Sequence, residues 1–351
     1  MPSFELQANP WRRPFAGGRG SAAPAFHRAL AGYAPTDLRD EPELAAALGV
    51  GRVWLKFERE RFGLPAFKFL GASWAAEQLL GGRDAAGVTL VTATDGNHGR
   101  AVARVARMRG LAAHILVPAG TAQARIDAIA GEGADVEVVD GSYDDAVRRA
   151  AAMAADDVLV LSDTSWPGYE QVPRWVVEGY ETIFTEADEQ LGGARPDVAL
   201  IPIGVGSLAA AAAAHWPESP PLLVGVEPSS AACAFASIRA GAPVEVPGPH
   251  HSIMAGLNAG SVSLQAWPVL RDRYDAFCTI DDGWAEQGIR RLAAIGVEAG
   301  EVSGGVLGAA GALCADAAGR KLLEIGREAS VLLLLTEGVT DPVTWQRIVS
   351  G

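Results

Sequence analysis

The chain has 351 residues, of which 49% are hydrophobic and 20% charged, a composition that supports a large buried core and argues against global disorder. Its formal net charge of -13 argues against nucleic acid or an anionic membrane as the main partner. The cysteines, at positions 233, 278 and 314, form no CxxC pair, so neither a disulfide framework nor a metal site is expected.

The middle of the chain alternates between short apolar runs and helical stretches of roughly ten residues. Strands are predicted at 88–94, 114–117, 136–139 and 158–161, and helices at 100–109, 122–131 and 143–155. This alternation is typical of βαβ units and predicts a parallel sheet.

After a predicted helix at 170–190 the alternation starts again. We expect a strand at 198–203, a helix at 208–216, a strand at 222–227, a helix at 231–240, irregular chain over 241–280 and a last strand at 331–336. The first 35 residues are expected to wrap a surface. The predicted class is α/β with two open-sheet lobes, a smaller domain at 70–185 and a larger one at 1–69 and 186–351. Ligands bind such sheets at the carboxyl ends of the strands, which places the site in the cleft between the lobes.

Lysine is rare in this chain, with Lys56, Lys68 and Lys321 as its three copies. Lys56 alternates with apolar neighbours and is predicted to point outward from a strand, while Lys321 lies among helical charges. Lys68 stands at the start of a predicted helix, where the positive helix end would lower the pKa of its amine. A lysine of lowered pKa is a good Schiff-base nucleophile. The alternative is a solvated surface lysine.

The motif TATDGNHGR, residues 92–100, places polar side chains between two glycines where a strand is predicted to end and a helix to begin. These side chains belong to Asp95, Asn97 and His98. Asp95 or Asn97 could simply cap the helix. A cap alone does not explain three polar side chains at the carboxyl end of a strand, so the motif is a candidate part of a site.

The motif GVGSLA, residues 204–209, joins a predicted strand to an alanine-rich helix. Its backbone N–H groups and the helix N-terminus form a cradle for an anion. It also fits the dinucleotide pattern G-x-G-x-x-A, with Glu227 closing the next strand, so NAD binding is a rival interpretation. A tight turn without a ligand is the third possibility.

Two further strand ends carry polar residues. Asp163 follows the strand predicted at 158–161 and is expected to point into the cleft, unless it only caps the turn. Thr336 and Glu337 end the last strand, which is predicted to be buried on both faces. The hydroxyl of Thr336 therefore needs a partner, either backbone or a ligand nitrogen.

Together these motifs make the chain resemble the fold-type II pyridoxal-phosphate enzymes, the tryptophan synthase β family, and within it the diaminopropionate ammonia-lyases. The sequence departs from the family's usual pattern at positions such as Pro65, where Asn is usual, and Val339, where Asp is usual. These departures affect the wall of the substrate pocket, and the cofactor residues are kept. The resemblance covers residues 26–348 and rests on blocks that keep the family's order: AFHRALAGYAPT, RFGLPAFKFLGAS, TATDGNHGR, DTSWPGYEQVPRWVVEGY, GVGSLA, MAGLNAG and TEGVTDP.

The resemblance implies pyridoxal 5'-phosphate as the cofactor and a role for each matching residue. Lys68 would carry the cofactor covalently, Asn97 would hydrogen-bond its phenolic oxygen, and Thr336 would face its pyridine nitrogen. Asp95 matches a second base, and Asp163 matches the acid that recognises the distal amine of the substrate. The phosphate would lie in a cradle formed by Gly204, Val205, Gly206, Ser207 and Leu208.

The implied function is β-elimination from D- or L-2,3-diaminopropionate, giving pyruvate and two molecules of ammonia, by a homodimer. A small amino acid is the expected partner, without nucleic acid or membrane. The alternatives are another fold-type II reaction (serine or threonine dehydration, or β-replacement), an NAD-dependent oxidoreductase, and a non-catalytic binding protein. No apolar run reaches the roughly 18 residues of a membrane span and no secretory signal is visible, so a cytoplasmic protein is expected.

Overall fold

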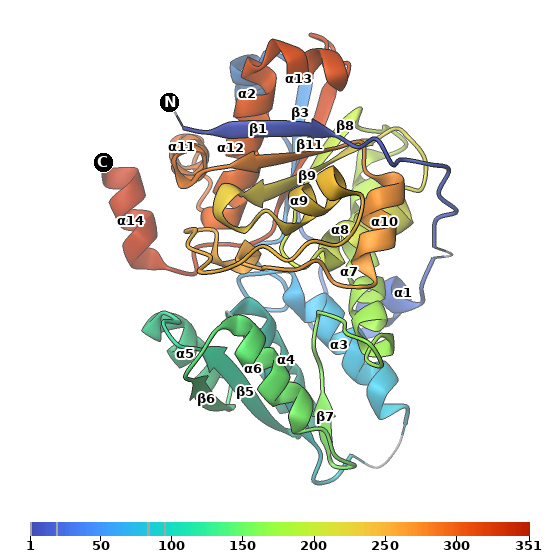
Figure 1. The fold of residues 1–351 in the computed structure, drawn as a ribbon, viewed down its shortest axis with the longest axis vertical. Helices are drawn as coiled ribbons and strands as arrows, with labels where there is room; N and C mark the ends of the chain where they lie inside the picture. Colours follow the sequence, from blue (N-terminus) through green and yellow to red (C-terminus); the bar gives the residue numbers. More distant parts are fainter. Residues whose placement is uncertain (1, 19, 83–84, 95) are drawn as a thin grey trace.

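The computed structural model describes residues 2–18, 20–82, 85–94 and 96–351. Over these ranges the strands form two sheets, one of seven strands and one of four, and helices cover them (Figure 1). The larger sheet fills the upper part of Figure 1 and the smaller sheet the lower part. The predicted α/β class with two lobes is confirmed.

The larger sheet is mostly parallel. Its strands are β1 (Phe4–Ala8), β2 (Leu38–Asp40), β3 (Arg52–Phe57), β8 (Val198–Pro202), β9 (Leu222–Pro228), β10 (Ala276–Ile280) and β11 (Ser330–Leu335). They lie in the order β1-β10-β9-β8-β11-β3-β2, with the edge strands β1 and β2 antiparallel to their neighbours. The central strands β8 to β11 are buried almost throughout, as expected for a parallel sheet covered on both faces.

The smaller sheet is entirely parallel and has the order β6-β5-β4-β7. Its strands are β4 (Thr89–Ala93), β5 (Ala112–Pro118), β6 (Asp135–Val139) and β7 (Val158–Val160). The helices between them are α4 (Asn97–Arg109), α5 (Gln123–Ala130) and α6 (Tyr143–Ala152). The βαβ pattern predicted over 88–161 is thus confirmed, and the carboxyl ends of its strands share one edge.

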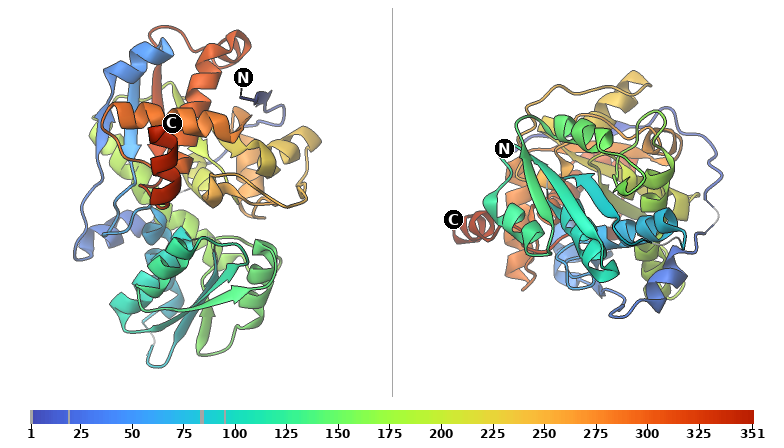
Figure 2. Two further views of the ribbon diagram at one scale, coloured as in Figure 1. Left: turned by 90° about the vertical axis from the view of Figure 1, so that its left-hand side faces the viewer. Right: turned by 90° about the horizontal axis from the view of Figure 1, so that it is seen from below.

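The other helices surround the larger sheet or join it to the smaller one, and α14 lies on the surface of the larger lobe (Figure 2). Among the described residues, no helix combines the length and the apolar character that crossing a membrane requires. Their bounds are α1 (Ala23–Ala29), α2 (Pro42–Leu48), α3 (Lys68–Leu80), α7 (Gln171–Leu191), α8 (Ser207–His215), η1 (Ser229–Ala231), α9 (Cys233–Ala240), η2 (Ala255–Leu257), α10 (Ala266–Arg273), α11 (Asp282–Ala294), α12 (Glu301–Ala315), α13 (Ala317–Leu322) and α14 (Pro342–Ser350).

Helices α3 and α7 cross with a glycine on each side of the contact. A Cβ atom at Gly71 would lie 2.6 Å from the Tyr180 ring, and one at Gly179 would lie 2.5 Å from the carbonyl oxygen of Leu70. Only glycine allows the two backbones to approach so closely. The crossing fixes α3 in place, and with it Lys68, the first residue of that helix.

The two lobes share a hydrophobic core. One continuous cluster of buried side chains contains Leu90 and Ile115 of the smaller sheet together with Ile201 and Leu334 of the larger sheet. Residue 70 lies within α3 and residue 185 within α7. The division of the chain into domains at these two positions stays a prediction.

Two predictions about the larger lobe are wrong. Residues 241–280 are not irregular throughout, because α10 and β10 lie within them. Strand β10 is only five residues long, and its pairing with β1 and β9 defines it rather than a local pattern. Lys56, predicted to point outward, is fully buried.

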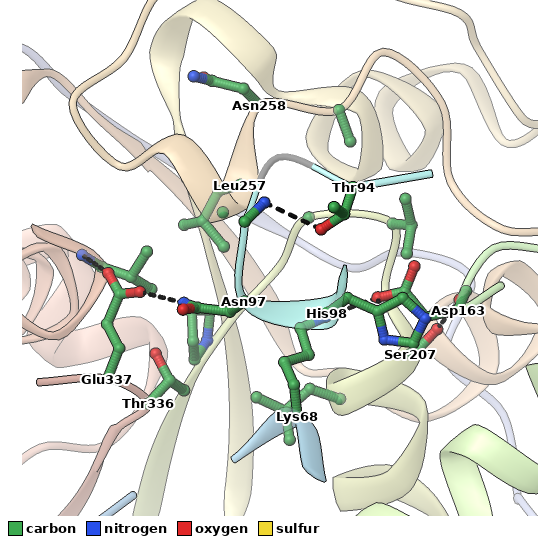
Figure 3. Close-up of a pocket in the computed structure, with 18 of the residues that line it drawn as sticks. Lys68, Thr94, Asn97, His98, Asp163, Ser207, Leu257, Asn258, Thr336 and Glu337 are labelled. Atoms are coloured by element: carbon green, nitrogen blue, oxygen red, sulfur yellow. Dashed lines mark hydrogen bonds and ion pairs between the residues drawn. The ribbon is translucent and has the colours of Figure 1, made fainter. Parts of the chain in front are cut away.

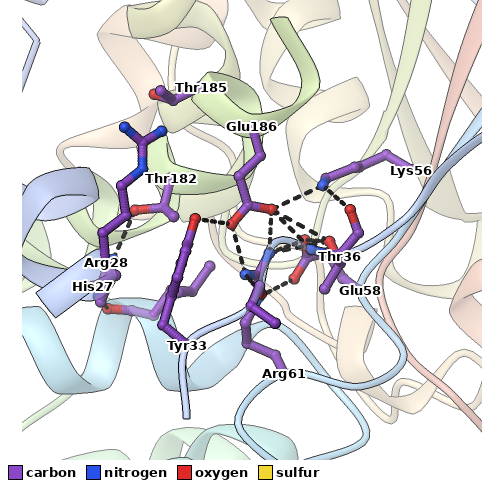
Figure 4. A network of polar contacts seen from close by, with 12 residues as sticks. His27, Arg28, Tyr33, Thr36, Lys56, Glu58, Arg61, Thr182, Thr185 and Glu186 are labelled. Carbon is purple, nitrogen blue, oxygen red and sulfur yellow. Dashed lines mark hydrogen bonds and ion pairs between the residues drawn. The ribbon is translucent and has the colours of Figure 1, made fainter. Parts of the chain in front are cut away.

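Lys56 is buried because an ion partner from α7 reaches it. Its Nζ donates to Glu186 Oε2 at 2.9 Å, to the carbonyl oxygen of Thr36 at 2.7 Å and to Gln190 Oε1 at 3.0 Å (Figure 4). Arg61 Nη1 donates to the other oxygen of Glu186 at 2.7 Å. A buried charge is tolerated only when it is paired and hydrogen-bonded in this way.

Candidate active site

A cavity lies between the two lobes, at the carboxyl ends of β4, β8 and β11 (Figure 3). Asp95 lies outside the described residues. All the other site residues predicted from the sequence line this cavity together, namely Lys68, Asn97, Asp163, Gly204, Val205, Gly206, Ser207, Leu208 and Thr336.

Lys68 begins α3, as predicted, but its pKa is not lowered. Its Nζ lies 2.7 Å from Asp163 Oδ2, and the lysine side chain is 21% exposed. Burial alone would lower the pKa of Lys68, but the charge of Asp163 outweighs burial and raises it above its usual value. The lowered pKa expected from the helix end is wrong, because an ion partner from a distant part of the sequence dominates. The solvated surface lysine is excluded as well.

Asp163 is a buried anion at the wall of the cavity. Its carboxylate pairs with Lys68, and its Oδ2 lies 3.8 Å from His98 Nδ1. Burial raises the pKa of Asp163, but His98 and Lys68 together lower it to about 2. The carboxylate is therefore ionised at neutral pH, and it can bind a cationic amine.

Thr94, which the sequence analysis missed, shapes the turn before α4. Its Oγ1 accepts hydrogen bonds from the backbone N–H groups of Gly96 at 2.9 Å and Gly99 at 3.0 Å. Thr94 therefore serves as the cap of this turn, and Asn97 does not. A threonine two residues before the first glycine of the motif was the signal that could have identified it.

The side chain of Asn97 instead crosses the cavity to the larger lobe. Its Nδ2 donates to Glu337 Oε2 at 2.7 Å (Figure 3). Burial raises the pKa of Glu337, and the nearby positive charge of Arg125 opposes that shift. Arg125, from α5, also lines the cavity and was not predicted.

The loop 204–208 presents backbone N–H groups at the start of α8. Gly206 has φ +98, a conformation that favours glycine. Within the described chain, no acceptor is found for the N–H groups of Val205, Gly206, Ser207 and Leu208. The hydroxyl of Ser207 donates to the carbonyl oxygen of Asp163 at 2.6 Å. Free N–H groups at a helix N-terminus are a ready anion site.

Thr336 directly follows β11 and is 3% exposed. Considering only the residues with described positions, its hydroxyl has no hydrogen-bond partner, although it lines the cavity. A buried hydroxyl is costly unless it is bonded. Of the two partners expected from the sequence, backbone and a ligand nitrogen, no backbone partner is found among the described residues.

Glu227 does not support dinucleotide binding. It is fully buried, and its carboxylate accepts hydrogen bonds from the backbone N–H groups of Ala234 at 2.8 Å and Phe235 at 2.7 Å. These bonds satisfy the first turn of α9, so the carboxylate is not available to a ribose.

The comparisons with known proteins agree with this geometry. A model of the family described as pyridoxal-phosphate dependent enzymes matches residues 29–337. A diaminopropionate ammonia-lyase from Salmonella typhimurium is 36% identical over 95% of this chain and 92% of its own. The crystal structure of the Escherichia coli diaminopropionate ammonia-lyase with an aminoacrylate–PLP azomethine intermediate superposes with a TM-score of 0.90 at 32% identity, covering 99% of this chain and 97% of the other.

A threonine deaminase from Solanum lycopersicum, at 23% identity, covers 100% of this chain and 97% of its own with a TM-score of 0.79, which is evidence for a common fold. The cavity, its lysine and its anion cradle thus occur in a chain that aligns with such enzymes almost from end to end. The chain belongs to the family of pyridoxal-phosphate dependent enzymes, in the fold-type II group that includes the diaminopropionate ammonia-lyases.

Proposed function

We propose that this protein is a pyridoxal-phosphate dependent ammonia-lyase that acts on 2,3-diaminopropionate and yields pyruvate and two molecules of ammonia. The observation that carries the proposal is the buried carboxylate of Asp163, 2.7 Å from the amine of Lys68. An ammonium group therefore fits beside Asp163, within reach of the lysine. The similarity to diaminopropionate ammonia-lyases along 95% of the chain supports the same substrate.

The residues of the cavity fit pyridoxal phosphate. The cofactor, when bound, supplies an electron sink that stabilises negative charge on the substrate Cα. Lys68 offers a primary amine for covalent attachment, and residues 204–208 offer free N–H groups for a phosphate. The hydroxyl of Thr336 offers a partner to a ring nitrogen, and the amide of Asn97 offers a donor to a phenolic oxygen.

The chain's own residues would then divide the proton transfers. Lys68 and Asp95 are the proposed bases for the Cα proton, one for each face of the substrate. Asp163 holds the β-nitrogen in its ammonium form. This matters because nitrogen leaves as neutral ammonia only when it is protonated. The released product hydrolyses to pyruvate and the second ammonia.

The direct test measures both products with the purified protein loaded with cofactor. With D- or L-2,3-diaminopropionate, two molecules of ammonia should appear for each pyruvate. Borohydride reduction followed by peptide mapping should place the pyridoxyl group on Lys68. Label on Lys56 or Lys321 instead would contradict the proposed attachment.

The alternatives predict different product ratios. Serine or threonine dehydration releases one ammonia for each 2-oxo acid, and β-replacement releases no 2-oxo acid. A clear preference of the wild-type enzyme for serine over diaminopropionate would remove the diamine proposal and leave a general pyridoxal-phosphate lyase.

We further propose that the enzyme works as a homodimer in the cytoplasm, as its resemblance to the family implies. Light scattering after size-exclusion chromatography of the holoenzyme tests the first statement, and cell fractionation the second. A mass of 36.5 kDa, that of one chain, would contradict the dimer.

A further inference from the structure

Glu337 lies where the end of β11, the start of α4 and the start of α12 meet in the cavity wall. It directly follows Thr336 at the end of β11 and is 5% exposed. Its Oε2 accepts the hydrogen bond from Asn97 Nδ2 of the smaller lobe, and its Oε1 accepts one from the backbone N–H of Val302 at 3.2 Å (Figure 3). Each oxygen of the carboxylate thus has its own donor.

The backbone and the surroundings of Glu337 keep it in this place. Its carbonyl oxygen accepts from Ser303 Oγ at 2.8 Å and from the N–H of Gly300 at 3.2 Å. A Cβ atom at Gly300 would lie 2.9 Å from both Cγ and Oε1 of Glu337, so the glycine leaves the space that the side chain occupies. Ala66, two residues before Lys68, bridges to the backbone of Glu337.

Burial raises the pKa of Glu337, while the charges of Arg125 and Lys68 and the two hydrogen bonds to its oxygens favour the ionised form. In that form the carboxylate can only accept hydrogen bonds. The amide of Asn97 has two ends of similar shape, a carbonyl oxygen and an NH2 group, and only the NH2 end can face Glu337. One proton of that NH2 group is used by Glu337, and the other remains for a second acceptor in the cavity.

We propose that Glu337 is a positioning residue that fixes the orientation of the Asn97 amide, so that its second N–H proton is presented to the phenolic oxygen of the cofactor. This inference rests on the proposed function. Glu337 itself need not touch the cofactor.

The conservative variant Glu337→Gln removes this constraint, because glutamine can donate as well as accept and can pair with either end of Asn97. With the amide reversed, its carbonyl oxygen would face the phenolic oxygen. We expect the Kd for pyridoxal phosphate to rise roughly 10-fold, as for a lost hydrogen bond to a charged group, and the absorbance maximum of the bound cofactor to shift.

A double-mutant cycle tests whether Glu337 acts through Asn97. The Kd for the cofactor and the absorbance spectrum are measured for the wild type, Glu337→Gln, Asn97→Ala and the double variant. We expect the roughly 10-fold effect of Glu337→Gln to fall below about 2-fold when Asn97 is already alanine. An equal effect of Glu337→Gln in both backgrounds would overturn the inference.

Glu301 provides the matched control. It is another buried carboxylate near this wall, and burial together with the charge of Glu337 raises its pKa to about 7, but it makes no hydrogen bond or ion pair with Asn97 among the described residues. Glu301→Gln should combine additively with Asn97→Ala in the same cycle. Coupling of the same size for Glu301 would point to a general loss of structure and overturn the specific role of Glu337.

A crystal structure of the wild-type holoenzyme gives a readout that depends on no variant. Asn97 Nδ2 should lie within hydrogen-bond distance of both Glu337 and the phenolic oxygen, and a separation of Asn97 from Glu337 beyond about 4 Å would overturn the inference. If the wild type binds the cofactor and the cycle is additive, only the role of Glu337 fails. If the wild type binds no cofactor, the proposed function fails too.

Discussion

Lys68 and Asp163 lie 95 positions apart in the sequence, yet their charged atoms are 2.7 Å apart in the cavity. Lys68 starts α3, and Asp163 follows β7 of the smaller sheet. The carbonyl oxygen of Asp163 is also bonded to Ser207, at the start of α8. Asp163, proposed to bind the substrate amine, is thus hydrogen-bonded to the loop 204–208, proposed to bind the cofactor phosphate. A shift of one should therefore move the other.

Removing the charge of Asp163 should act on the diamine specifically. Asp163→Asn keeps the size of the side chain but loses the ionic partner of the β-ammonium. We expect kcat/KM for 2,3-diaminopropionate to fall by about one to two orders of magnitude for both enantiomers, because a charge-assisted hydrogen bond is worth about 1.5–3 kcal/mol. Steady-state kinetics with serine as the matched neutral substrate provides the control. A similar loss with serine would mean that Asp163 does not recognise the amine.

Asp95 should affect one enantiomer more than the other. If Asp95 is the base for the D-substrate, Asp95→Asn should lower turnover of D-2,3-diaminopropionate by about 10²–10⁴-fold, the usual effect of losing a positioned general base. Turnover of the L-enantiomer should change much less. Parallel assays with the two enantiomers check this, and equal losses would assign Asp95 to a step that both share.

The buried network around Glu186 should be a large contributor to stability. Lys56→Met leaves Glu186 without one of its two cationic partners, and breaking a buried ion pair costs roughly 3–5 kcal/mol. Denaturant unfolding measures the change. Arg28→Gln, which removes an exposed pair with Glu189 near the same helix, should cost less than about 1 kcal/mol. Equal effects of the two variants would contradict the importance of burial.

His27 should make the protein less stable as the pH falls. Burial lowers the pKa of His27 to about 3, and its ring lies between α1, α3 and α7 with bonds to Thr182 and Leu70. Its folded pKa is below the unfolded value of about 6.5, so its contribution is complete above pH 6.5 and is lost as the pH falls toward 3. The loss is at most about 1.4 kcal/mol per pH unit.

Comparing the wild type with His27→Gln isolates the contribution of His27 to the pH dependence of stability. Burial also lowers the pKa of His98, whereas bonds to Asp188 and Glu181 raise that of His215, so both contribute to the wild-type curve. Melting temperatures from pH 7.5 to pH 5 should fall more steeply for the wild type than for the variant. Parallel curves would show that His27 is not the source.

The sequence correctly predicted the strands, helices and turns whose formation depends on neighbouring residues. The alternation over 88–161 and the glycine turns at 96–99 and 204–206 were sufficient to place β4, α4 and α8 and to locate the cavity. These predictions succeeded because strand period, helix length and glycine conformation are set by neighbouring residues.

The rest depends on partners that are distant in the sequence. Lys56 is buried because it pairs with Glu186 of α7, which is 130 positions away in the sequence. The pKa of Lys68 is raised because Asp163, also distant in the sequence, lies beside its amine. The bond between Asn97 and Glu337 spans 240 positions. No local pattern contains such pairs, and an isolated lysine between apolar residues looks the same whether it faces solvent or a buried carboxylate.

The glycine crossing of α3 and α7 has a consequence for how the protein can vary. Gly179 lies directly against the backbone of Leu70 and Gly71, with no side chain between them, and Gly71 lies against the side chains of Tyr180 and Val176. Lys68 begins one of these helices and Glu186 sits on the other. A displacement of α7 should therefore move α3, and Lys68 with it. Substitutions outside the cavity lining, such as Gly179→Ala, should misplace the reactive amine before they unfold the protein.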